Sequence, residues 1–158
     1  MGRCPRDPWR VAVRCLFGYP TVIASPARLA DGTPFPTWAW LTCPRITEAV
    51  SRCESAGGVA EWASRATTDS DLAAALRELD AAVRVVRERE GGGEQASGDV
   101  GLAGQRDPLG VKCLHAHVAY ALAGLDDPIG CAVLEQGGRE CDDERCAKLL
   151  RQAGEDRS

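Results

Sequence analysis

The sequence has no apolar run near the roughly 20 residues that a membrane-spanning helix requires. Residues 1–10 are charged and interrupted by proline, and they lead into no apolar signal-peptide core, so we expect no export. The chain also lacks an excess of positive charge: its net charge is −4, which argues against a nucleic-acid-binding surface. Together these absences predict a cytoplasmic protein that binds neither membranes nor nucleic acid.

Familiar catalytic signatures are missing as well. No Gly-Lys-Ser or Gly-Lys-Thr follows the glycine-rich stretch, so there is no phosphate loop, and there is no Gly-x-Ser-x-Gly elbow. The C-x-x-C spacing of many zinc and redox motifs is absent too. The common hydrolase and kinase classes are therefore disfavoured, and whether the protein is an enzyme stays open.

What the chain does have is eight cysteines in 158 residues, the length of one ordinary domain. In a reducing compartment cysteines act as metal ligands, reactive thiols or buried small apolar residues more often than as disulfides. We expect a single domain over residues 1–158, with its core at about 9–136.

The first part of the chain predicts a small antiparallel sheet. Residues 10–16, 21–24 and 37–42 have the composition of strands, and turn residues separate them, among them Gly18-Tyr19-Pro20. The third strand leads into Thr42-Cys43-Pro44, where proline suits the first position of a helix. The fold class predicted is α+β, with about three N-terminal strands covered by several helices.

Helical patterns fill most of the remaining chain. A glycine-rich stretch at 91–108 predicts a flexible loop, and a polar helix is expected near the C-terminus. The predicted helices lie at 44–56, 59–65, 70–86, 111–125, 128–136 and about 142–152.

The longest helical pattern carries an apolar stripe from Leu72 to Val86, with Asp80 and Arg84 spaced for an ion pair. Fewer than three heptads are present, which favours a core helix packed on the sheet over a coiled coil. The alternative is a partner surface that forms a homodimer.

Both histidines of the chain lie in one short stretch, Val111 to Tyr120, together with Cys113. On a regular helix Cys113 and His117 are four residues apart and share a face, which pairs a thiol with an imidazole. His115 falls on the other side of such a helix. It joins Cys113 only if the first turn is irregular or Cys113 sits at the entrance of the helix.

Several strings of the sequence are specific in combination: Arg14-Cys15, Gly18-Tyr19-Pro20, Asp31-Gly32-Thr33-Pro34-Phe35-Pro36-Thr37, Leu41-Thr42-Cys43-Pro44, Ser51-Arg52 and Lys112-Cys113-Leu114-His115. Together they resemble the bacterial domain of unknown function 501 family over about residues 9–134. That resemblance brings no established activity; it implies a compact bacterial cytosolic protein, often encoded beside cell-division and polyphosphate-metabolism genes. It also implies that Cys15, Cys43 and Cys113 are the motif cysteines and His115 the motif histidine, whereas helical geometry prefers His117, so both histidines are retained.

We therefore predict a metal site formed by Cys15, Cys43, Cys113 and His115 or His117. Cys15 ends a strand, while Cys43 and Cys113 lie near helix starts, where the helix dipole favours a thiolate. Three thiolates and an imidazole suit zinc, and three thiolates alone suit an iron-sulfur cluster. Substrate, partner and metal identity are left open.

Other interpretations of the cysteines and of the chain are retained. We interpret Cys53 and Cys131 as small apolar residues that pack in the core. Cys141 and Cys146 are about 140° apart on one regular helix, which cannot aim both at one ion. Two alternative hypotheses are a metal-free thiol enzyme with a Cys-His pair, and a non-catalytic adaptor linked to cell division that uses the Leu72 to Val86 helix.

Overall fold

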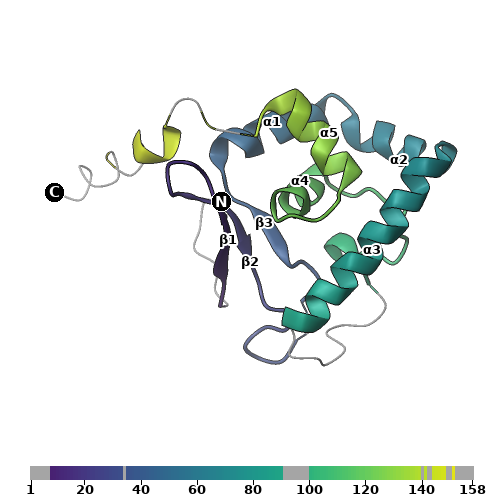
Figure 1. The fold of residues 1–158 in the computed structure, drawn as a ribbon, viewed down its shortest axis with the longest axis horizontal. Helices are drawn as coiled ribbons and strands as arrows, with labels where there is room; N and C mark the ends of the chain where they lie inside the picture. The colour runs from purple at the N-terminus through teal and green to yellow at the C-terminus, as the bar shows by residue number, and fades with distance from the viewer. Residues whose placement is uncertain are drawn as a thin grey trace.

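Three short strands form the sheet that the sequence predicts. The computed structural model describes residues 8–33, 35–90, 100–139, 141, 144–148 and 151. Strands β1 (Arg10–Arg14), β2 (Pro20–Ala24) and β3 (Ala39–Leu41) are antiparallel and lie in the order β1-β2-β3 (Figure 1). Arg10 pairs with Ala24 across the first ladder, and Val22 pairs with Leu41 across the second. The central strand β2 is the most buried of the three.

Helices make up most of the remainder, and this confirms the α+β class. Each predicted helix that falls wholly within the described residues is present, with shifted ends. Their bounds are α1 Pro44–Ser55, α2 Gly58–Thr68, α3 Ser70–Glu90, the short 3-10 helix η1 Leu102–Gly104, α4 Leu114–Leu122 and α5 Pro128–Gly137.

Local chemistry explains where these helices begin. Pro44 opens α1 after the extended residue Cys43. The Asp69 carboxylate accepts hydrogen bonds from the amides of Asp71 and Leu72 and so caps α3. Between α1 and α2 the chain turns at Gly57, whose φ of 93° lies in the left-handed region that favours glycine.

Helix α3 buries its apolar stripe inside the chain. Its larger apolar side chains, from Leu72 to Val83, belong to the core, and its main contacts are with α2 and α5. The sequence predicted that this helix packs on the sheet; instead, α4 lies between the helix and the sheet (Figure 1). The predicted ion pair is present, with Arg84 Nε 2.8 Å from Asp80 Oδ2. The stripe is therefore not an exposed partner surface. A homodimer through this helix, which stays a prediction, would have to use its outer face, where Val85 is 45% exposed.

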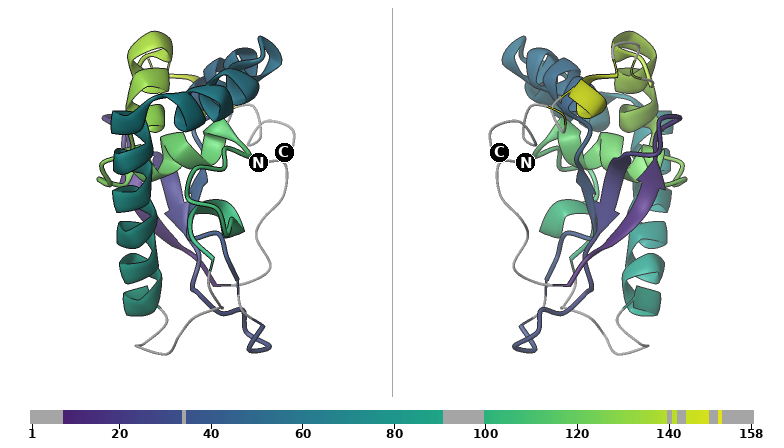
Figure 2. Two further views of the ribbon diagram at one scale, coloured as in Figure 1. Left: turned by 90° about the vertical axis from the view of Figure 1, so that its right-hand side faces the viewer. Right: turned by 90° about the vertical axis from the view of Figure 1, so that its left-hand side faces the viewer.

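Helix α4 lies at the centre of the molecule, between the sheet and α3 (Figures 1 and 2). It packs on β3, α1, α5 and η1, and nearly all of its residues are buried. Tyr120 shows how it is anchored to the sheet: its hydroxyl accepts a hydrogen bond from the Trp38 amide, and the two rings meet edge to face at 5.6 Å. The segment that contains Cys113, His115 and His117 is thus fixed by a central, largely buried helix.

Two predicted segments lie partly outside the described residues. Of the glycine-rich stretch 91–108, residues 100–108 are described, and Leu102 is buried in the core while Val100 accepts a hydrogen bond from Arg87. Of the C-terminal helix predicted at 142–152, residues 145–148 and 151 are helical. Within the part of the chain that is described, no helix has the length and apolarity to cross a membrane.

Candidate metal centre

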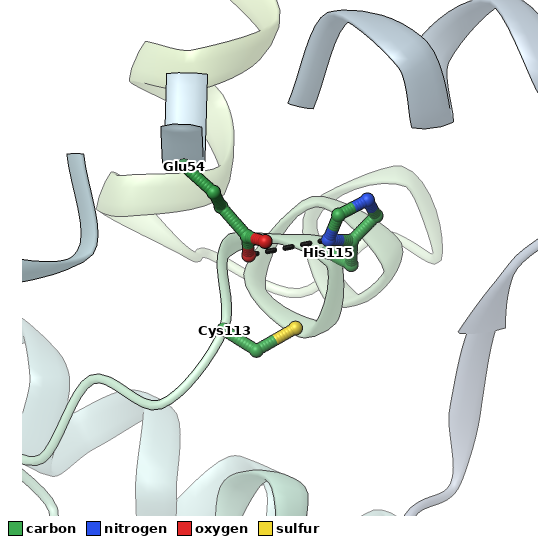
Figure 3. A group of neighbouring side chains, drawn as sticks. All are labelled: Glu54, Cys113 and His115. Carbon is green, nitrogen blue, oxygen red and sulfur yellow. Dashed lines mark ion pairs between the residues drawn. The ribbon is translucent and has the colours of Figure 1, made fainter. Parts of the chain in front are cut away.

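Glu54, Cys113 and His115 bring three metal-ligand types to one point. One oxygen, one sulfur and one imidazole nitrogen of these side chains all lie within 4.8 Å of one another (Figure 3). Glu54 comes from the last turn of α1, and the other two come from the start of α4. All three side chains are half-buried, so the group is reachable from solvent. The packing of α1 on α4 creates this juxtaposition.

The start of α4 decides which histidine joins Cys113. Cys113 is the N-cap and has an extended backbone, with φ −163° and ψ 126°; the helix begins at Leu114. The helical spacing that pairs Cys113 with His117 therefore does not apply. Cys113 sits at the helix entrance, which is the condition under which the sequence allowed His115 to lie beside it.

Two hydrogen bonds and one imidazole–carboxylate contact hold the histidine and the carboxylate in place. His115 Nδ1 lies 3.2 Å from Glu54 Oε1, and His115 Nε2 lies 3.2 Å from Ser51 Oγ. The Glu54 carboxylate also accepts the Leu114 amide at 2.6 Å, which places a negative charge at the positive end of α4. One carboxylate thus caps the helix and orients the imidazole.

The environment of Cys113 favours the protonated thiol when no ion is bound. Burial raises the pKa of Cys113 above its ordinary value, and the nearby Glu54 carboxylate raises it further, although backbone amides of Ala116 and His115 act in the opposite direction. A bound cation supplies the positive charge that replaces the thiol proton. A free thiolate at Cys113 is therefore disfavoured, while the thiol, carboxylate and imidazole together are side-chain types that bind a divalent metal.

Glu54 is the member of this group that sequence reasoning missed. It lies three residues after Ser51 on α1, so both polar side chains share one helical face. The sequence signal for Glu54 is this polar pair, which lies beside the apolar residues Ile46 and Val50 of the same helix. Only the packing of α1 against α4 shows that this edge meets Cys113.

His117 faces a different part of the molecule. It is 2% exposed, and its Nδ1 lies 2.9 Å from one carboxylate oxygen of Asp127 and 3.1 Å from the other. Asp127 is fully buried and also accepts the Gly130 amide. His117 is therefore held by a buried carboxylate and does not join the Glu54, Cys113 and His115 group.

Cys15 and Cys43 lie elsewhere again. Both line a small pocket that is shared with Cys141 and Cys146, and Cys113 is not among its lining residues. Of the five predicted ligands, Cys113 and His115 lie in one group, Cys15 and Cys43 share this pocket, and His117 lies apart from both. The three motif cysteines lie apart because their segments pack against different elements. Cys113 begins α4, which packs on α1, whereas Cys15 and Cys43 follow strands β1 and β3 at one end of the sheet.

Cys53 and Cys131 are half-buried and pack against the core. For Cys53→Ala we expect a loss of about 1 kcal/mol or less in the free energy of unfolding, because little volume is removed. Chemical denaturation measures this loss, and zinc content should match that of the parent. A drop in bound zinc would instead make Cys53 a ligand.

Residues 11–135 match the family described as "Protein of unknown function (DUF501)". The match runs from within β1 to within α5 and includes Glu54, Cys113 and His115. No curated protein and no solved structure matches the chain. Since the match spans most of the 158 residues, the chain belongs to the DUF501 family.

Proposed function

We propose that this protein binds one zinc ion through Glu54, Cys113 and His115, with a fourth coordination position open. The observation that carries this proposal is the convergence of three ligand atoms within 4.8 Å on two packed helices. Zinc binds thiolate sulfur at about 2.3 Å and imidazole nitrogen or carboxylate oxygen at about 2.0–2.2 Å. Ligand atoms around one zinc are then roughly 3.3–3.8 Å apart, so small side-chain adjustments suffice.

The donor set favours zinc over an iron-sulfur cluster. Clusters are held mainly by cysteine thiolates, and this group contains one thiol, one imidazole and one carboxylate. Mixed sulfur, nitrogen and oxygen ligands are common for zinc. The Glu54 carboxylate and the Cys113 thiolate would also neutralise the charge of a divalent ion.

Three protein ligands with partial exposure are typical of a zinc site that keeps a position for water or substrate. When bound in such a site, zinc supplies Lewis acidity and activates its water. Ser51 would orient the His115 ring, because its hydroxyl lies beside Nε2. Nδ1, which faces Glu54, would then be the nitrogen that binds the ion. A partner of this kind fixes the orientation of a metal-binding imidazole.

The metal-free thiol enzyme is less well supported by the same geometry. The raised pKa of Cys113 leaves little thiolate at neutral pH, and His115 is placed between Glu54 and Ser51. Rapid alkylation of Cys113 by iodoacetamide at neutral pH, unaffected by added zinc, would support the thiol-enzyme hypothesis over the zinc site.

Zinc titration of the purified chain by calorimetry tests the proposal. We expect Cys113→Ala and His115→Ala each to weaken binding at this site by roughly 100-fold or more, and Ser51→Ala by about tenfold. Cys53→Ala is the matched control, because its half-buried thiol lies on α1 outside the group. Equal zinc affinity in the parent, Cys113→Ala and His115→Ala would refute the site.

A further inference from the structure

Four cysteines line the small pocket at one end of the sheet that contains Cys15 and Cys43. Cys15, Cys43, Cys141 and Cys146 all line it, together with Thr21. The pocket has room for about one water molecule or one bare ion. Four thiols around so small a space form a set of metal-ligating side chains that the Glu54, Cys113 and His115 group does not use.

Two of these cysteines are placed by the sheet. Cys15 stands in the turn after β1, where its amide donates to Tyr19 and its carbonyl accepts from Gly18, both at 2.9 Å. Cys43 is 5% exposed and precedes α1, and its side chain makes no capping hydrogen bond. The residue before it, Thr42, is bound to β2, because its amide donates a hydrogen bond to the Thr21 carbonyl. Both sulfurs are therefore held on ordered backbone.

The other two cysteines come from the C-terminal segment. Arg145 forms an ion pair with Glu48, which attaches this segment to α1. Cys146 lies in the helical residues 145–148, whereas Cys141 lies before them and is not helical. The angle of about 140° expected for two cysteines on one helix therefore does not apply, and both can face the same pocket.

An independent observation concerns a buried hydroxyl group that lines this pocket. Thr21 is 4% exposed and lines this pocket, and its Oγ1 has no hydrogen-bond partner among the residues that the structure describes. A buried hydroxyl left unpaired costs free energy, so its proton is expected to find an acceptor in the working state. A metal-bound thiolate is such an acceptor, since it carries negative charge and no proton of its own.

We propose that Cys15, Cys43, Cys141 and Cys146 bind a zinc ion as a closed four-thiolate site that fastens the C-terminal segment to the sheet. Four thiolates satisfy the tetrahedral coordination of structural zinc without an open position. In the described structure these sulfurs do not form a group of three or more within 4.8 Å. Tetrahedral zinc needs sulfurs roughly 3.8 Å apart, so binding draws the segment closer.

The test separates this site from the one proposed above. In the double variant Cys113→Ala/His115→Ala we expect about one zinc ion per chain to remain, and cobalt substitution to give the intense sulfur-to-metal absorption of several thiolates. Adding Cys146→Ser, a half-exposed position that tolerates the change, should remove this ion and the absorption. Cys131→Ser is the matched control and should retain both.

Limited proteolysis supplies a readout that does not depend on metal counting. Zinc should slow cleavage of the segment after α5 in the parent and in the Cys113→Ala/His115→Ala variant, but not in Cys146→Ser. A double variant that binds no zinc, a cobalt spectrum without strong sulfur absorption, or iron and sulfide in place of zinc would each overturn the proposal. None of these results bears on zinc affinity at Glu54, Cys113 and His115.

Discussion

Asp127→Ala is expected to lower the free energy of unfolding by about 3–5 kcal/mol, the largest effect of any single truncation that we predict. The Asp127 carboxylate is fully buried and accepts hydrogen bonds from His117 Nδ1 and from the Gly130 amide. Alanine would leave both donors buried and unpaired, and would also remove the cap of α5. For a chain of this size the melting temperature should fall by on the order of 10 °C.

Asp126→Ala is the control for this experiment. Asp126 is the neighbouring residue and is exposed, so its loss should change stability by no more than about 0.5 kcal/mol. Asp127→Asn keeps one acceptor oxygen and should fall between the two. If urea denaturation gave Asp127→Ala and Asp126→Ala the same midpoint, the buried pair would not stabilise the native state.

Gly130→Ala should also be strongly destabilising, by about 1–3 kcal/mol or more, because α5 approaches α4 too closely for a side chain. A Cβ atom at this position would lie 2.3 Å from the His117 carbonyl oxygen and 2.7 Å from the Ala121 Cβ. One contact is with backbone and the other with a side chain that has no free rotation. Neither can move aside without separating the two helices.

The matched substitution is Gly137→Ala, at the last residue of the same helix. There the nearest contact of a Cβ is Ala49 Cβ at 3.2 Å, which a shift of a few tenths of an ångström relieves. Thermal unfolding should therefore separate the two variants clearly, with Gly137→Ala close to the parent. Equal melting temperatures would mean that α4 and α5 are not packed as described.

Local patterns determined much of the architecture. The strands follow from short apolar runs separated by turn residues, and Pro44 and Asp127-Pro128 mark helix starts because their chemistry acts over neighbouring residues. The stripe from Leu72 to Val83 and the Asp80–Arg84 ion pair follow from helical periodicity alone. These features depend on contacts within a few residues, and the sequence contains them directly.

The grouping of the cysteines and histidines was decided only by the tertiary structure. A helix that starts at Leu114 leaves Cys113 extended, and a shift of one residue in such a boundary turns a side chain by about 100°. Glu54 reaches Cys113 because α1 packs on α4. Cys141 and Cys146 share a pocket with Cys15 and Cys43, and the Arg145–Glu48 ion pair attaches their segment to α1. The sequence by itself identified which residue types could bind a metal. Which of them meet depends on packing between elements far apart in the chain, and no local pattern records that packing.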